Sequence, residues 1–302
     1  MSRPCGLPVW LVTLPCFVAF APAASAQRTA QRDSQRDSRV PAAVTSLRVC
    51  ADPNNLPFSN EKGEGFENRI AERLASDLGL PLRYTWKPQR RGFVRTTLNA
   101  GECDLIMGVP ATYDMVRTSR PYYTSSYVFV YRRDRGYHIT SLADSALRRL
   151  KIGIHVIGDD YHNTPPAEAL AARGIIDNVK GYTIYGDYSR PNPPARLIEA
   201  VAKGEVDVAI VWGPLAGYFA PRESVPLTIV PVPKESDITG QKWTFAISMG
   251  VRHRDQGLAV LLDQLLDREQ PSIDAILSDY GVPLVKTDAV HREPDRASSR
   301  VH

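Results

Sequence analysis

The chain has 302 residues, of which 43% are hydrophobic and 23% charged, and its formal net charge is +4. This length can hold one or two domains with a sizeable core, and the ordinary composition excludes fibrous and broadly disordered proteins. The positive charge is weak and scattered, so we expect no nucleic-acid binding.

Residues 1–26 have the features of a secretory signal peptide. Arg3 supplies the positive charge, Leu7 to Phe20 the apolar segment, and Ala24-Ser25-Ala26 a cleavage site of small residues. The apolar segment is short for a membrane span and contains prolines, so an uncleaved anchor is the weaker alternative. We therefore expect cleavage, export to the periplasm, and no transmembrane segment in the mature chain.

Cleavage would remove two of the four cysteines and leave Cys50 and Cys103. Two cysteines in an oxidising compartment can pair. Cys50 falls inside a predicted strand and Cys103 just before another, and a bridge requires Cα atoms within about 7 Å. A disulfide and two buried free thiols both remain open.

The first half of the chain alternates strands and helices. Residues 27–46 contain a repeated Gln-Arg-Asp-Ser and few apolar residues, which predicts a disordered leader. The alternation that follows predicts a parallel sheet covered on both faces. Its predicted elements are strands at Leu47 to Ala51, Leu82 to Trp86 and after Gly101, and helices at Gly65 to Leu78 and around Phe93 to Leu98.

The second half repeats this alternation, crosses back and ends in two predicted helices. A polar tail, residues 286–302, is predicted to be disordered. The predicted strands are Tyr127 to Tyr131, Lys151 to Val156, Val179 to Ile184, Val206 to Val211 and Trp243 to Val251; the predicted helices run from Thr164-Pro165 towards Arg173, from Ala195 to Lys203, from Leu258 to Leu266 and from Ile273 to Tyr280.

Two short segments recur at a fixed offset of 103 positions. Gly101-Glu102-Cys103-Asp104 returns as Gly204-Glu205-Val206-Asp207, and the strand start at Leu47 returns at Leu150. Chance resemblance between buried strands is the alternative, but two matches at one spacing favour two similar lobes. We predict an α/β clamshell in which two crossing strands join lobe 1 (residues 47–132 and 241–285) to lobe 2 (residues 133–240). A ligand site would lie in the cleft, at the carboxyl ends of the strands.

The order of these segments resembles the periplasmic solute-binding proteins of the amino-acid type. The landmarks are Leu56-Pro57-Phe58, Gly65-Phe66-Glu67, the Gly-Glu-x-Asp turn and Arg120-Pro121-Tyr122-Tyr123. Three longer runs, at residues 50–60, 88–93 and 155–161, resemble more specifically the solute-binding-like proteins encoded beside quinoprotein methanol dehydrogenases. The resemblance implies a periplasmic accessory of pyrroloquinoline-quinone-dependent methanol oxidation. The expected partner is the dehydrogenase, with its c-type cytochrome as a second candidate.

The charged groups with which such proteins usually hold an amino acid are missing from their expected positions. Asn55 stands where an aromatic residue usually stacks on the ligand, and Trp212 where an acidic residue meets the ammonium group. The arginine for the carboxylate comes late, at Arg117. A bidentate arginine and a buried carboxylate are the strong contacts of such a site, so amino-acid transport is disfavoured.

Polar candidates for the cleft each have a plain structural alternative. Asp52, Asn54 and Asn55 could bind a polar group or a hard cation, or form an Asx-rich turn. Asp159-Asp160 would repel an anion, or bond to backbone amides at the start of a helix. The remaining candidates for the cleft or for a partner are Arg90 and Arg91, which are otherwise a solvated pair, and Phe58, Pro110, Tyr113 and Trp212.

The sequence contains no zinc-binding histidine pair, haem motif, phosphate loop or nucleophile elbow. We therefore expect no metal, no cofactor and no catalytic residue. Our prediction is a non-enzymatic accessory that docks on the dehydrogenase and aids its maturation or activation. One alternative is the receptor of an ABC importer for a solute other than an amino acid. The other is a dehydratase-like enzyme, which would need cationic anchors and a general acid in the cleft.

Overall fold

The computed structural model describes residues 45–156, 164–183, 188–233 and 240–286, which all belong to one compact unit. The predicted signal peptide, almost all of the predicted leader and tail, and Asp159-Asp160 lie outside these residues. Within the described residues, no helix is long and apolar enough to cross a membrane.

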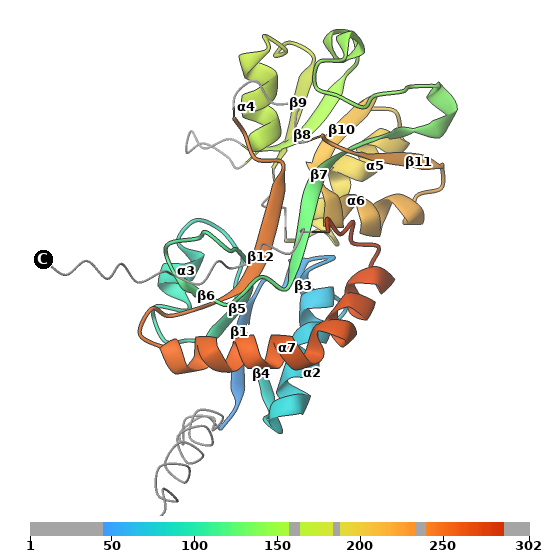
Figure 1. Cartoon of the computed structure of the whole chain (residues 1–302). Coiled ribbons are helices and arrows are strands. Elements are labelled where there is room, and N and C mark those ends of the chain that lie inside the picture. Colours follow the sequence, from blue (N-terminus) through green and yellow to red (C-terminus); the bar gives the residue numbers. More distant parts are fainter. Residues whose placement is uncertain (1–44, 157–163, 184–187, 234–239, 287–302) are drawn as a thin grey trace, which may run out of the picture. The chain divides into compact units, whose positions relative to one another are not determined.

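The fold is a two-lobed α/β clamshell in which one mixed sheet, 10-stranded in the described residues, runs through both lobes (Figure 1). In lobe 1 the parallel strands β4-β1-β5 are followed by the antiparallel strands β12 and β7. The lobe 1 strands are β1 (Leu47–Ala51), β4 (Leu82–Trp86), β5 (Leu105–Pro110), β6 (Arg117–Thr118) and β12 (Thr244–Val251); β2 (Asn54–Asn55) and β3 (Ser59–Asn60) form a separate hairpin.

Lobe 2 has the same plan, with parallel strands β9-β8-β10 followed by antiparallel β7 and β11. Its strands are β8 (Ile152–Val156), β9 (Val179–Thr183), β10 (Val208–Trp212) and β11 (Leu227–Pro231). The helices of the two lobes are α2 (Phe66–Leu78), α3 (Phe93–Thr96), α4 (Pro165–Ala172), α5 (Arg196–Ala202), α6 (Gly213–Phe219) and α7 (Gln256–Asp279).

Two strands connect the lobes. β7 (Tyr123–Arg132) pairs with β12 through its first four residues and with β10 and β11 through the remainder. Just before β12, Trp243 packs into a lobe 2 core, whereas Ile247 and Met249 on β12 pack into the lobe 1 core. Both lobes therefore share hydrogen-bonded and apolar contacts along these strands, and the cleft lies beside them.

The 103-residue offset is present in the strand pairing. Val49 pairs with Leu105 in lobe 1, and Ile152 pairs with Val208 in lobe 2. The turn repeats as well, because the Asp104 N–H donates to the Arg48 carbonyl at 2.9 Å and the Asp207 N–H donates to the Lys151 carbonyl at 2.8 Å. The two lobes are thus built on the same local geometry.

The two predicted C-terminal helices are wrong, because α7 is one continuous helix with Pro271 inside it. Proline removes a helical hydrogen bond and usually bends a helix, and Figure 1 shows α7 change direction along its length. Leu266 before Pro271 and Ile273 after it are both fully buried in the lobe 1 core. Burial on both sides keeps the helix continuous where the local sequence predicts a break.

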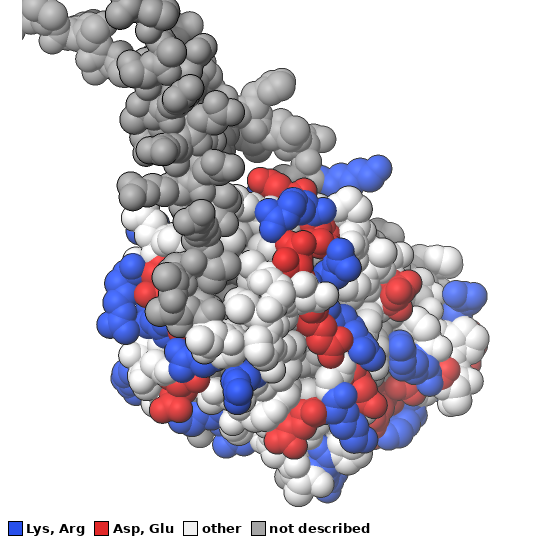
Figure 2. All heavy atoms as spheres, turned by 90° about the horizontal axis from the view of Figure 1, so that it is seen from below, with Lys and Arg blue, Asp and Glu red and all other residues white. Residues whose placement is uncertain are grey.

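Charges of both signs are interspersed on the face formed by lobe 1 in Figure 2. Two ion pairs join α2 to α7: Arg73 to Glu269 at 2.5 Å and Arg268 to Asp77 at 2.7 Å. The described part of this face offers no continuous basic surface of the kind that nucleic-acid binding requires.

Candidate functional site

A cavity of about 560 Å³ lies in the cleft, where β1, β5 and β10 end. A smaller cavity of about 220 Å³ adjoins it and shares four lining residues: Asn55, Phe58, Pro194 and Trp212. This is the edge at which open α/β sheets bind ligands. The larger cavity brings together seven of the predicted site residues: Asp52, Asn54, Asn55, Phe58, Pro110, Tyr113 and Trp212.

Asp52 is buried, and both of its carboxylate oxygens accept hydrogen bonds. Oδ1 accepts from the Asn54 N–H at 2.9 Å, and Oδ2 accepts from the Gln89 N–H at 2.7 Å. Oδ2 also accepts from the Tyr188 hydroxyl of lobe 2 at 2.6 Å. The bond from the Asn54 N–H forms the Asx turn that the sequence predicted as one alternative. The bond from the Tyr188 hydroxyl joins the two lobes.

The Asn54 side chain forms two further bonds between the lobes. Its Nδ2 donates to the Arg190 carbonyl at 2.8 Å, and its Oδ1 accepts from the Asn192 N–H at 3.2 Å. We call these two bonds, together with the one from Tyr188 to Asp52, the lobe latch. The side-chain oxygens of Asp52 and Asn54, which could have bound a hard cation, are therefore engaged in contacts within the protein.

None of the predicted arginines lines a cleft cavity. The Arg90 guanidinium lies over the Tyr188 ring, 5.1 Å from its centroid, so it supports the lobe latch. Arg91 is exposed. Arg117 is also away from the cavity, on β6, where its Nε donates to the His253 carbonyl at 3.3 Å. No lysine or arginine lines either cleft cavity in the described part of the chain.

Glu67 is a cleft residue that the sequence argument used only as a landmark. It stands in the first turn of α2 and lines the larger cavity. Its carboxyl lies against β5 at Gly108, where a Cβ would come within 2.2 Å of Oε1. Burial raises the pKa of Glu67 to about 8, and no described residue donates a hydrogen bond or a positive charge to it. The Gly65-Phe66-Glu67 motif at the start of the helix is the sequence feature from which Glu67 could have been predicted as a cleft residue.

Aromatic side chains form much of the remaining wall of the larger cavity, among them Phe58, Tyr113, Tyr123 and Trp212. Trp212 lies 5.8 Å from Phe245 and 5.5 Å from Tyr127, measured between ring centroids, in edge-to-face arrangements. Burial raises the pKa of Tyr123 well above its usual value, so its phenol is neutral. Trp212, at the end of β10, thus lines both cleft cavities.

His155 lines the smaller cavity from the end of β8. Burial lowers its pKa to about 4, so the ring is neutral at physiological pH. Its carbonyl accepts a hydrogen bond from the Thr164 hydroxyl at 2.7 Å, which joins β8 to the start of α4. A neutral imidazole adds no positive charge to the cleft.

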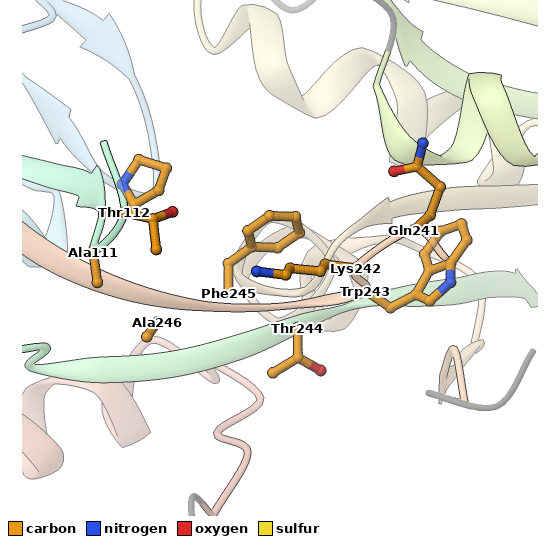
Figure 3. A pocket seen from close by; sticks show the side chains of 9 residues that line it. Ala111, Thr112, Gln241, Lys242, Trp243, Thr244, Phe245 and Ala246 are labelled. Atoms are coloured by element: carbon orange, nitrogen blue, oxygen red, sulfur yellow. The ribbon is translucent and has the colours of Figure 1, made fainter. Parts of the chain in front are cut away.

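A separate cavity of about 500 Å³ lies along the beginning of β12 (Figure 3). It shares Pro110 with the cleft and includes Lys242. Figure 3 shows Phe245 on one side of the strand and Thr244 on the other, as strand alternation requires. Its walls come from the end of β5 and from the segment that connects the lobes.

Cys50 and Cys103 are joined by a disulfide, with Cα atoms 5.5 Å apart. Cys103 precedes Asp104, whose N–H bonds to the strand that contains Cys50, and this pairing brings the two cysteines together. Among the described residues, no three histidine, cysteine, aspartate or glutamate side chains are grouped as a metal site would require.

The family model for bacterial extracellular solute-binding proteins, family 3, matches residues 47–280. The chain belongs to this family. This family 3 protein is 32% identical to Protein MoxJ of Methylorubrum extorquens over 284 residues, which cover 90% of this chain and 92% of the relative. It is 31% identical to Protein MoxJ of Paracoccus denitrificans, over 81% of this chain and 91% of the relative.

Among solved structures, this family 3 chain is similar to the periplasmic binding protein XoxJ from Methylobacterium extorquens. The two are 36% identical with a TM-score of 0.65, over 80% of this chain and 100% of the other. The resemblance to solute-binding proteins is therefore confirmed at the level of family and fold.

Proposed function

We propose that this chain is a periplasmic accessory protein of a quinoprotein methanol dehydrogenase. It docks on the dehydrogenase and aids its maturation or activation. The observation that carries the proposal is the likeness to MoxJ and XoxJ over most of each chain, together with the three residue runs described above. Two of these runs, at residues 50–60 and 88–93, supply Asp52, Asn54 and Gln89 to the cleft.

The chemistry of the cleft is consistent with a role other than amino-acid transport. An α-carboxylate taken out of water needs a cation, and no lysine or arginine lines the cleft in the described residues. An unpaired buried charge costs several kcal/mol, on the order of 3.

A dehydratase-like enzyme receives less support. Glu67 could supply a general acid, since its pKa is about 8. Substrates of this class carry carboxylates, however, and the same lack of cationic side chains leaves these groups without anchors. We therefore propose a non-enzymatic role.

The test combines recovery of the partner with activity. The purified mature protein, immobilised and exposed to periplasmic extract, should retain the dehydrogenase, and a strain that lacks the chain should lose most of its methanol oxidation. Complementation with the full chain should restore activity, whereas a version without residues 1–26 should not. Unchanged methanol oxidation in the deletion strain, with no dehydrogenase retained, would contradict the proposal.

A solute receptor for an importer is a second candidate, and the preserved cavity of about 560 Å³ favours it. Calorimetry with a panel of amino acids separates the cases. Saturable amino-acid binding would favour a transport role. It would also contradict the argument that the cleft, which no lysine or arginine lines in the described residues, cannot hold an α-carboxylate. Dependence of the phenotype on a permease would also favour the receptor.

A further inference from the structure

The charged side chains that line the larger cleft cavity are both acidic in the described part of the chain. They are Asp52 and Glu67. Asp52 is satisfied by the three donors described above, but Glu67 has no donor among the described residues. A half-buried carboxyl that is largely removed from water and has no partner is costly as an anion, so it either stays protonated or is matched by a positive charge from outside.

The surroundings of Glu67 suit a particular kind of positive charge. Phe58, Tyr113, Tyr123 and Trp212 line the same cavity, and Tyr123 is an immediate neighbour whose own pKa is raised partly by the Glu67 charge. Aromatic faces attract cations, most strongly when the cation is weakly hydrated and the site is shielded from water. An alkylated ammonium group has this character, and no group of three histidine, cysteine, aspartate or glutamate side chains that could hold a metal ion is found among the described residues.

We propose that the cleft binds a small organic cation, whose charge is met by the Glu67 carboxylate and by the ring faces of Tyr123 and Trp212. This inference goes beyond the accessory role and does not depend on it. No motif in the sequence assigns a ligand of this class.

Binding by this arrangement releases a proton. Glu67 begins as a neutral acid, and the cation is held by its anion, so one proton leaves the carboxyl for solvent as each cation enters. The titratable groups that face Glu67 are Tyr84 on β4, Tyr122 just before β7, Tyr123 at its first position, Tyr113 after β5 and, across the cavity, Asp52. Burial raises the pKa of each of these four tyrosines, so none of them loses a proton near neutral pH. The released proton therefore comes from Glu67.

The size of the cavity sets a limit but does not identify the compound. About 560 Å³ is ample for a trimethylammonium group with a short substituent, and the adjoining cavity can take the substituent. Choline is therefore a suitable probe. The alcohol in which a carbon atom replaces its nitrogen has the same shape without the charge.

The experiment is calorimetric titration of the purified mature protein with choline and with this uncharged analogue. Choline should bind at least about tenfold more tightly than the analogue. Its affinity should rise about tenfold from about pH 6 to about pH 7 and level off above about pH 8, because the fraction of ionised carboxyl limits binding. Buffers that differ in ionisation enthalpy should report the release of about one proton.

Glu67→Gln removes the charge and keeps the shape, and it should weaken choline binding by about tenfold or more and abolish the pH dependence. Glu61→Gln, at an exposed position before the same helix, is the matched control and should bind as the wild type does. The proposal is overturned if choline does not bind, if the analogue binds equally well, or if Glu67→Gln leaves choline affinity unchanged. The pH arm uses the wild type, so the test holds even if a variant folds poorly.

Discussion

At the scale of single residues, Glu67 illustrates how a cavity changes the chemistry of an ordinary side chain. A glutamate in the first turn of a helix is usually an exposed anion favoured by the helix dipole. Here the carboxyl is pressed against Gly108 and lines an aromatic cavity, and burial raises its pKa to about 8. The free-energy cost of removing the charged carboxylate from water exceeds its stabilisation by the helix dipole, so the Glu67 carboxyl is mostly protonated at neutral pH.

This shift links Glu67 to stability. Because the folded-state pKa lies above the unfolded value of 4.5, the folded protein binds more protons between about pH 4.5 and about pH 8. The contribution of Glu67 to stability is therefore present below pH 4.5 and is lost as the pH rises to 8. Glu67→Gln should match the wild type near pH 5 and exceed it by about 3 kcal/mol near pH 8.

Chemical denaturation of the wild type, Glu67→Gln and the Glu61→Gln control across this pH range measures the difference. A constant difference between wild type and Glu67→Gln would mean that the carboxyl is ionised in both states. The wild-type profile alone is insufficient, because His155 has an opposite dependence. Its lowered pKa makes stability fall as the pH drops below 6.5.

At the scale of elements, the two lobes share strand pairings and a turn, but the side-chain contacts at that turn differ between them. The pairing of β1 with β5 returns in β8 with β10 at the same offset, and so does the turn at Asp104 and Asp207. The contacts of the two carboxylates differ. Asp104 is held by Arg48 at 2.7 Å and Arg252 at 2.6 Å, whereas the Asp207 carboxylate accepts from the Lys151 N–H at 2.8 Å.

The disulfide is specific to lobe 1 and joins β1 to the turn before β5. It spans a sequence separation of 53 residues, and closing a loop of that size in the unfolded chain is worth about 4 kcal/mol. Reduction with dithiothreitol should lower the free energy of unfolding by about this amount. The Cys50→Ala/Cys103→Ala variant should be similarly destabilised and no longer respond to reductant.

Guanidinium denaturation with and without reductant checks this prediction. A wild type that is equally stable in both conditions would show that the oxidised bridge contributes nothing to folding. The double variant serves as the control for reductant, since its response should be absent.

At the scale of the whole molecule, the lobe latch connects the two halves through polar contacts across the cleft. It combines a hydrogen bond from Tyr188 to Asp52 with two bonds of Asn54, and Arg90 lies over the Tyr188 ring. Proteins of this architecture open and close by hinge motion. The latch therefore favours the closed arrangement without a bound ligand.

The Tyr188→Phe/Asn54→Ala variant removes all three bonds, each worth about 1 kcal/mol in net terms, and should shift the equilibrium towards an open cleft. Small-angle X-ray scattering should report a larger radius of gyration than for the wild type. Tyr137→Phe is the control, because it deletes a hydroxyl that bonds to Asp207 within lobe 2. Identical scattering from all three proteins would exclude the latch as a determinant of the lobe angle.

The sequence alone determined the lobe plan and most of the strands. Hydrophobic periodicity and turn residues are local signals, and the 103-residue repeat is a property of the chain itself. The bounds of β1 and β4 agree with the predicted ranges, and the resemblance to solute-binding proteins is confirmed. The cluster of Asp52, Asn54 and Asn55 also lies at the cleft, because strand ends of a parallel sheet meet at one edge.

Tertiary structure decided what depends on distant neighbours. α7 continues through Pro271 because buried residues on both sides anchor it, and Asp52 forms the lobe latch because Tyr188 reaches it from 136 positions away. Glu67 acquires its raised pKa only when β5 and the aromatic wall surround it. Desolvation, cross-lobe bonding and helix continuity arise from packing, and no local pattern in the sequence encodes them.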